Sequence, residues 1–485
     1  MAVSDPDAAT PATVTPRLRR GLNVWQAVGL SIALMAPSMA ANINPQGTAK
    51  AVGRAVPLAF LIATVGVLLV AYVFVRLCQR FHHAGSVYAF VAATLGARAG
   101  TVAGWSLMGT YCFYGVVTST ACGIFGTAFL QQVGLWAQPP DWAPFLISGL
   151  ALVLVWLLTV IPVRGGTRVL LSVEGITVAL ILVVSVAVLA RLIAGTAPEG
   201  LPATWSVFTL SPGTEVSAVF LGAVFGFLSF AGFEASATLG EEAREPRRDI
   251  PRAILGTAIF GGLYFVFVTA VEVMGFGADA DGVAAFTSSP SLLGDLGTRY
   301  VGPWVGDLIS LGAAVSAFGC ALACAVGGSR LLFALSRDAA GSRGLGGVSR
   351  QGTPALAAVV VVLAMYGIVA AGALGLRASA MDVFLASGTI GTLILLVVYL
   401  VTTLGAIRLL FFTPPLTVRR WELVIPLAAL VVLGYTVYAN VVPYPEGAAA
   451  AFPIVAGGWI LLGILAVAAV PRLARFAQRE DLTAP

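Results

Sequence analysis

The chain has 485 residues, of which 59% are hydrophobic and only 10% charged, and its formal net charge is +5. Soluble domains are about 45–50% apolar and about a quarter charged, so this composition argues against a soluble enzyme, a nucleic-acid binder and a disordered protein. A chain this apolar is expected to lie in a lipid bilayer, where each crossing takes about 20 residues.

Twelve apolar runs, separated by Arg, Pro and Gly, are expected to cross the bilayer. In chain order they are 22–45, 57–77, 98–130, 143–162, 169–194, 214–240, 253–276, 301–336, 354–374, 380–407, 421–442 and 451–471. Several exceed the minimum length, which predicts tilted or irregular segments. The sequence therefore predicts an all-α polytopic membrane protein with twelve transmembrane helices.

The positive charges alternate in step with these spans. Most of the 27 Lys and Arg residues fall in the N-terminal tail and in every second loop, whereas Lys50, Arg54, Arg191, Arg299 and Arg377 lie on the opposite side. Because Lys and Arg mark cytoplasmic loops, we expect a multi-pass protein of the cytoplasmic membrane with both termini in the cytoplasm. The two cytoplasmic tails are expected to be residues 1–21, which would be disordered, and residues 472–485.

One alternative concerns the first span. The run from Arg17 to Ala41 resembles a cleavable signal peptide, with basic residues, an apolar stretch and small residues in order. Its apolar stretch is long for such a signal, so a retained first helix is favoured. The remaining loops are too short to hold a soluble catalytic domain.

Two of the spans carry residues that interrupt a helix. The first contains Pro37, followed by polar residues, and the sixth contains three glycines and an acid between residues 222 and 234. Simple packing is an alternative, because Pro can merely kink a helix and Gly lets helices approach closely. The two spans are equivalent if 22–194 and 214–407 are two five-helix repeats, followed by two extra helices in 421–471. Interruptions at equivalent places point to a transporter site.

An interrupted helix has a simple binding chemistry. It leaves N–H groups unpaired where one half-helix starts and C=O groups unpaired where the other ends. Such a pair suits a zwitterion, with the carboxylate on the donors and the ammonium on the carbonyls. The residues therefore favour an amino-acid transporter.

Several motifs add a family resemblance. Residues 227–254 read FLSFAGFEASATLGEEAREPRRDIPRAI and resemble the sixth-span region of the amino acid–polyamine–organocation (APC) permease superfamily, as do, less specifically, residues 84–88, 104–105 and 329–338. The resemblance spans roughly residues 22–410. It implies a LeuT-type 5+5 inverted repeat, with helices 1 and 6 discontinuous, that transports an amino acid or amine by alternating access.

Carried over by position, the resemblance implies that two short segments contact substrate. These are Ala36, Pro37, Ser38, Met39 and Ala40 on span one, and Ser229, Phe230, Ala231, Gly232 and Phe233 on span six. The family's usual Gly-Ser-Gly-like step reads Pro37-Ser38-Met39 here. Some relatives use a span-five lysine for coupling, but the one lysine of this chain is Lys50, in an outside loop, so that mechanism is not expected.

Acidic residues inside the bilayer are costly and therefore functional candidates. Glu234 is the first choice for a carboxyl that couples transport to a proton; a structural acid bonded to freed backbone amides is the alternative. Glu174 is a second coupling candidate, with a salt bridge to Arg168 or Arg164 as the alternative. Glu272 is expected near the outside face. Tyr111 and Phe230 are candidate gates over the substrate, although most such aromatics simply pack.

The remaining residues suggest no catalytic centre. The five cysteines are read as buried hydrophobes, neither His82 nor His83 lies in a metal-ligand cluster, and no cofactor or nucleic acid is expected. Residues 241–252 form a charged inside loop that is a candidate latch. The absence of a P-loop motif argues against direct use of ATP. A polytopic membrane enzyme or a channel remains the alternative to a carrier.

Overall fold

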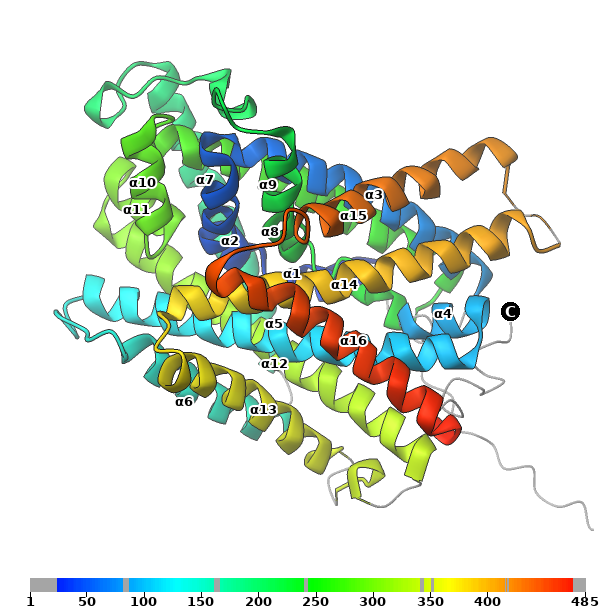
Figure 1. Cartoon of the computed structure of the whole chain (residues 1–485). Coiled ribbons are helices and arrows are strands. Elements are labelled where there is room, and N and C mark those ends of the chain that lie inside the picture. Colours follow the sequence, from blue (N-terminus) through cyan, green and yellow to red (C-terminus); the bar gives the residue numbers. More distant parts are fainter. Residues whose placement is uncertain are drawn as a thin grey trace, which may run out of the picture.

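The computed structural model describes residues 24–81, 87–160, 166–239, 243–340, 344–349, 353–414, 416 and 418–473. These residues form a helix bundle without a β-strand (Figure 1). The helices are α1 (Val24–Met35), α2 (Pro37–Val52), α3 (Val56–Arg80), α4 (Val87–Leu95), α5 (Ala97–Gln132), α6 (Ala143–Val160), α7 (Gly166–Ile193), α8 (Val216–Ser229), α9 (Pro246–Phe276), α10 (Ala280–Ser288), α11 (Leu292–Tyr300), α12 (Pro303–Ala340), α13 (Ala355–Ala370), α14 (Ala380–Phe411), α15 (Val424–Ala439) and α16 (Ala451–Ala469).

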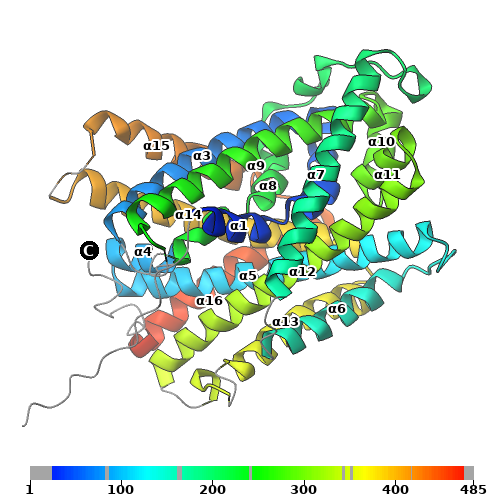
Figure 2. The same cartoon turned by 180° about the vertical axis from the view of Figure 1, so that it is seen from behind.

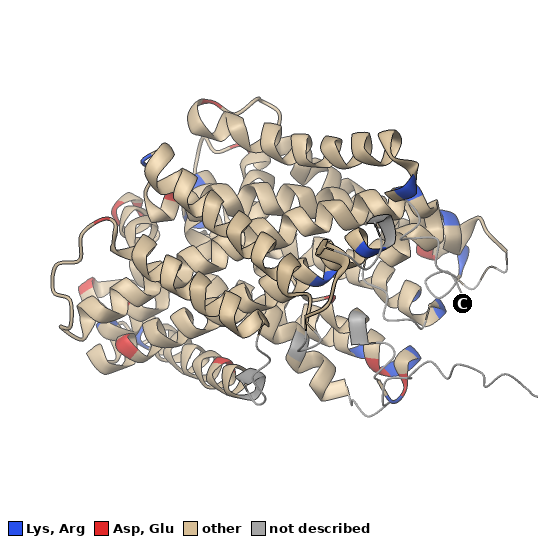
Figure 3. Ribbon diagram, turned by 90° about the horizontal axis from the view of Figure 1, so that it is seen from below, with Lys and Arg blue, Asp and Glu red and all other residues tan. Residues whose placement is uncertain are grey.

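Ten helical stretches of the described residues are long and apolar enough to cross a membrane. The first of them, Val24–Arg80, comprises α1, α2 and α3, and Val216–Ser229 is a shorter apolar helix that is not among the ten. This confirms the predicted all-helical, multi-span class. Lys and Arg gather mostly toward one end of the bundle, and its middle is almost free of charge (Figure 3).

The predicted interruption of the first span is present. Helix α1 ends at Met35, Ala36 adopts the left-handed conformation with φ 45° and ψ 57°, and α2 starts at Pro37. A non-glycine residue rarely adopts positive φ, and Pro is well placed at the first position of a helix. The helix after the break is longer than predicted, because it continues through Pro45 to Val52.

The sixth span is also interrupted, but over a shorter stretch than the glycines suggested. Helix α8 runs regularly through Gly222 and Gly226 and ends at Ser229, where a turn leads to a short 3₁₀ helix, η4 (Ala235–Leu239). A Cβ atom at Gly226 would lie 2.6 Å from the Cβ of Ala63, so this glycine allows close contact with α3. Only Gly232, with φ 99°, belongs to the unwound turn.

Helix α9 begins earlier than the predicted seventh span. It starts at Pro246 rather than 253, so residues 246–252 of the predicted latch loop form its first two turns. Proline at the start and Asp249 in the first turn are typical of a helix N-terminus. Arg248 pairs with Glu245 at 3.3 Å, and both side chains are exposed, so the pair adds little stability. Glu241 and Glu242 lie outside the described residues.

The long helices α5 and α12 lie side by side through the middle of the bundle; α1 and α2 contact α12, and α8 packs on α2, α3 and α14. From behind, α7 crosses next to α1 and α12 (Figure 2). Helices α6 and α13 run together along the lower edge, and α3, α9 and α15 occupy the opposite side (Figure 1). The two interrupted segments therefore meet at the centre of the bundle.

A reciprocal tryptophan pair fastens α16 to α5. The rings of Trp105 and Trp459 stack at 4.6 Å between centroids, and each indole N–H donates to the other's backbone carbonyl, at 2.8 and 3.0 Å. Two glycines make room for the rings: a Cβ at Gly463 would lie 2.5 Å from Trp105, and one at Gly109 2.2 Å from Trp459. Helix α16 is thus held against α5 by specific side-chain packing and not only by lipid.

Gly463→Ala is expected to lower the Tm of the purified protein, because an indole ring must shift to admit the methyl group. Overpacking of this kind costs about 1–3 kcal/mol. Gly457→Ala on the same helix is the matched control, since no atom lies within 4 Å of the added Cβ. Equal Tm values for the two variants in a thermal unfolding assay would contradict this role of the glycine.

Candidate functional site

The two breaks and the faces of α5 and α12 enclose a cavity of about 80 Å³. Its lining residues are Leu34, Met35, Met39, Val87, Leu107, Thr110, Tyr111, Tyr114, Val117, Thr118, Leu228, Ala231, Gly232, Glu234, Ala235, Ala237, Cys320, Cys324 and Leu395. The volume is well below the 300–1,000 Å³ typical of drug-sized ligands, so the cavity suits a small molecule. Most of its wall is apolar.

The N-terminus of α2 is capped by side chains from two other helices. The N–H of Ser38 donates to Oε1 of Glu174 on α7 at 2.9 Å, and the N–H of Met39 donates to the hydroxyl of Ser316 on α12 at 3.3 Å. Glu174 is 5% exposed. A helix N-terminus attracts negative charge, and here a carboxylate of the protein itself supplies it.

The carbonyl end of α1 also has partners. The thiol of Cys320 donates to the carbonyl of Leu34 at 3.2 Å, and the hydroxyl of Ser31 accepts the N–H of Ser236 at 3.0 Å. Across the break, the hydroxyl of Tyr264 donates to the carbonyl of Pro37 at 3.4 Å. These bonds tie α1 to α12 and to the segment after α8, and they tie α2 to α9.

Glu234 closes the unwound turn after α8 and faces the cavity. The amide groups of Gly232 and of Glu234 itself are directed at its carboxyl group, and the hydroxyl of Tyr399 lies nearby. In the described part of the chain, neither Oε2 of Glu234 nor the hydroxyl of Tyr399 has a hydrogen-bond partner, although both are buried. A buried carboxylate oxygen without a partner is costly, so this corner of the site is incomplete as it stands.

Two tyrosines form the wall opposite the breaks. Tyr114 shares a hydrogen bond of 3.0 Å with Thr392 of α14, which fixes its ring. Tyr111 packs against Gly327 on α12, where a Cβ would lie 3.1 Å from the ring. Both side chains line the same cavity as Glu234.

Sequence comparison places this architecture among known proteins. Residues 26–470 match the family model described as "Amino acid permease". The chain belongs to this family. The relatives named below are an importer, a permease and a transporter rather than enzymes.

Three relatives show the range of the family around this permease. It is 28% identical to a low-affinity putrescine importer, PlaP, of Escherichia coli K12, over 54% of this chain and 55% of the importer. It is 26% identical to the branched-chain amino acid permease BcaP of Lactococcus lactis, over 66% of this chain and 70% of the relative. It is 28% identical to an uncharacterized transporter of Mycobacterium tuberculosis, over 68% of each chain. The match thus spans about half the length of the putrescine importer.

The structure brings only some of the predicted site residues to the cavity of the permease. Those that line it are Met39, Tyr111, Ala231, Gly232 and Glu234. The other residues of the first break, Ala36, Pro37, Ser38 and Ala40, are buried beside the cavity and do not line it. The backbone N–H of Ser38 does not face the cavity but donates its hydrogen bond to Glu174, as described above.

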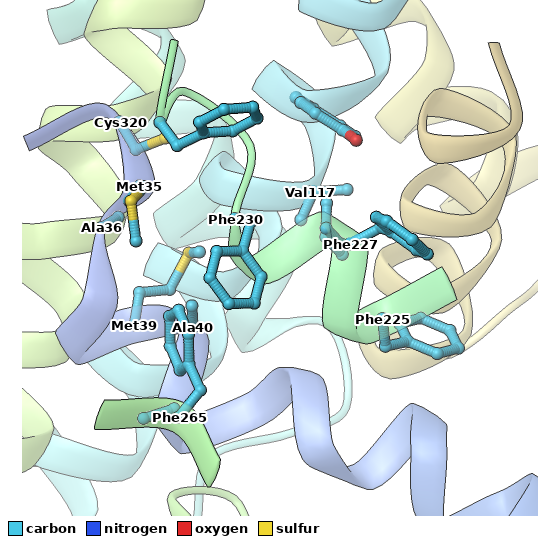
Figure 4. Close-up of a cluster of buried hydrophobic side chains, with 14 of the residues drawn as sticks. Met35, Ala36, Met39, Ala40, Val117, Phe225, Phe227, Phe230, Phe265 and Cys320 are labelled. Atoms are coloured by element: carbon cyan, nitrogen blue, oxygen red, sulfur yellow. The ribbon is translucent and has the colours of Figure 1, made fainter. Parts of the chain in front are cut away.

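The remaining predicted residues of the sixth span pack or bond elsewhere. Ser229 accepts a hydrogen bond of 2.8 Å from the amide of Asn44. Phe230 is fully buried and lies between α2 and α8, edge-on to Phe265 at 5.4 Å (Figure 4). Phe233 lies edge-on to Phe74 at 6.0 Å. None of the three lines the cavity.

Two further acidic residues are buried in the described part of the fold. Glu174 accepts a hydrogen bond from the α2 N-terminus; the side chains of its expected ion-pair partners, Arg164 and Arg168, lie outside the described residues. Glu272 is fully buried about one turn before the end of α9, and neither of its oxygens has a hydrogen-bond partner in the described part of the chain; its expected place near the outside face stays a prediction. His82 and His83 are not described either.

Several residues that line the cavity were not predicted from sequence to contact substrate. Leu107, Tyr111, Tyr114 and Thr118 are spaced three or four residues apart and form one face of α5, as do Cys320 and Cys324 on α12. Helical periodicity extended from Tyr111 would have found these positions. Leu34 and Met35 had no such signal, because they belong to the apolar run before the break.

Proposed function

We propose that this permease is a secondary active transporter that moves an amino acid or a related amine across the cytoplasmic membrane by alternating access. Twelve spans in a 5+5 inverted repeat, with both termini in the cytoplasm, are part of this proposal. The single observation that supports it most is that two interrupted helices meet at one small cavity with a carboxyl group in its wall. The names of the relatives, a putrescine importer and a branched-chain amino acid permease, agree with this substrate range.

In this proposal the interrupted helices move against α5, α12 and their neighbours. Ala36 and Gly232 have positive φ angles at the two breaks, and a few such residues can absorb the change between inward and outward states. Tyr111, which lines the cavity, and Phe230, which packs between α2 and α8, are the candidate gates (Figure 4). The contact of Glu174 with the α2 N-terminus is a second element whose breaking would accompany the motion.

We also propose that Glu174 and Glu234 couple transport to a proton or to exchange. A carboxyl in the hydrocarbon region is costly to ionise unless it finds a partner. Glu174 has the Ser38 amide as its partner in this state, and Oε2 of Glu234 has none within the ranges that the structure describes. Movement of the breaks would change both environments, which is what coupling requires.

Counterflow in proteoliposomes tests the proposed function. Vesicles containing the purified permease are loaded with a mixture of unlabelled amino acids and amines and diluted into labelled compounds, one at a time. A carrier is expected to accumulate label transiently above equilibrium and to saturate. Flux that grows linearly with concentration would indicate a channel, and chemical turnover would indicate an enzyme; either result would contradict the proposal.

A further inference from the structure

The amide groups exposed at the two breaks are already occupied by the protein. At the start of α2, Pro37 has no N–H, the amides of Ser38 and Met39 bind Glu174 and Ser316, and that of Ala40 bonds the carbonyl of Ala36 at 2.9 Å. These are the first four positions of the helix, where unpaired donors are expected. A substrate carboxylate finds no free donor there.

The second break is occupied in the same way. In the turn after α8, the amides of Phe230, Ala231 and Phe233 bond to nearby carbonyls at 3.0–3.1 Å. Those of Gly232 and Glu234 are directed at the carboxyl group of Glu234. Both sets of freed amides therefore face carboxylates, carbonyls or a hydroxyl of this chain, and a carboxylate of the protein at each break would repel a second one.

The cavity also has the wrong charge for a carboxylate and the right one for a cation. Among its described lining residues, Glu234 is the sole Asp, Glu, Lys, Arg or His. Oε2 of Glu234 and the hydroxyl of Tyr399 are near each other, and neither has a hydrogen-bond partner among the described residues. An ammonium group donates up to three hydrogen bonds, so one bound in the cavity would give Oε2 of Glu234 a partner. The rings of Tyr111 and Tyr114 in the same wall attract a cation as well.

From this arrangement we propose that the substrate is an organic amine without a carboxylate, whose ammonium group binds Glu234 and whose carbon chain lies along the apolar wall. Leu34, Met39, Val117 and Leu228 supply that wall. This inference rests on the proposed transport function and restricts it to amines. The expected zwitterion site is thereby replaced, because Glu174 holds the place of the substrate carboxylate.

Matched pairs of compounds that differ only in the carboxylate test this inference. The purified, full-length permease in lipid nanodiscs is titrated with leucine and 3-methylbutylamine, phenylalanine and 2-phenylethylamine, and ornithine and putrescine. Binding is followed by the shift in Tm, since a ligand of the folded state stabilises it. In at least one pair the amine is expected to bind about tenfold or more tightly than the amino acid.

The outcomes separate the inference from the proposed function. Tighter binding and counterflow of the amino acids would overturn the amine assignment and leave the transporter intact. Absence of both binding and counterflow for all six compounds would overturn both. If Glu174→Ala lets an amino acid bind that the parent protein rejects, Glu174 is confirmed as the group that stands in for the substrate carboxylate.

A variant pair tests the contact itself. Glu234→Gln removes the charge with almost no change in shape, and the affinity for the preferred amine is expected to fall about tenfold or more. Glu446→Gln, on the exposed loop before α16, is the matched control and keeps the parent affinity. An unchanged affinity in Glu234→Gln, with Tm in the absence of ligand also unchanged, would overturn the assignment.

Discussion

Gly232→Ala is expected to abolish most transport while leaving a folded protein. Gly232 has φ 99°, and a Cβ added to it would lie 2.7 Å from the Cβ of Leu34 on α1. The substitution therefore combines backbone strain of about 1–3 kcal/mol with a collision between the two breaks. Because the displaced atoms line the cavity, we expect the initial counterflow rate to fall about tenfold or more, which corresponds to about 1.4 kcal/mol.

A second glycine variant separates the effect of backbone strain on transport from the effect of the collision with Leu34. Gly195, in the turn after α7, also has positive φ, but no atom lies within 4 Å of its added Cβ. Gly195→Ala carries the strain without the collision and is expected to transport normally at a slightly lower Tm. If Gly232→Ala transports as fast as Gly195→Ala, the close approach of the two breaks is not important for transport.

Substitutions of Glu174 are expected to separate its structural role from coupling. In Glu174→Ala the Ser38 amide loses its partner, and an unpaired buried amide costs about 1–3 kcal/mol, so both Tm and transport should fall. In Glu174→Gln the side-chain carbonyl still accepts the bond, so Tm should stay near that of the parent. If Glu174 couples transport to a proton, Glu174→Gln loses the pH dependence of uptake.

The measurement is uptake into proteoliposomes with and without an imposed pH gradient, across a range of external pH. Glu215→Gln is the control, because Glu215 is exposed just before α8 and its carboxylate accepts a hydrogen bond from the nearby Ser217. Full retention of pH-dependent uptake in Glu174→Gln would remove Glu174 from coupling and leave it a positioning residue for α2.

The interruptions of the helices could be predicted from sequence because the residues that cause them are local signals. Pro37 ends one hydrogen-bonding pattern and starts another, and the glycine run of span six marked the correct stretch. The exact place within that run could not be predicted, since Gly226 suits a tight contact with α3 as well as an unwound turn. The surrounding packing decides between them, and Gly232 is the residue that unwinds.

The chemistry of the site was harder to predict from sequence, because it depends on contacts between residues that are far apart in the chain. Glu174 and Ser38 are 136 residues apart, and Met39 and Ser316 are 277 apart. No periodic pattern connects such positions. The capping of α2 by a carboxylate could therefore not be predicted from sequence, which instead predicts free amides at the start of α2. The early start of α9, in contrast, is predictable from local signals, because Pro246 and Asp249 are typical of a helix N-terminus.

The most direct test of substrate binding at the two breaks uses cysteines already present. Cys320 and Cys324 line the cavity, whereas Cys78 and Cys122 are buried elsewhere and serve as internal controls. Alkylation by N-ethylmaleimide is followed site by site with mass spectrometry, with and without the compound that shows counterflow. We predict that saturating substrate slows labelling of Cys320 and Cys324 and leaves Cys78 and Cys122 unchanged; equal labelling of all four with and without substrate would contradict binding at the breaks.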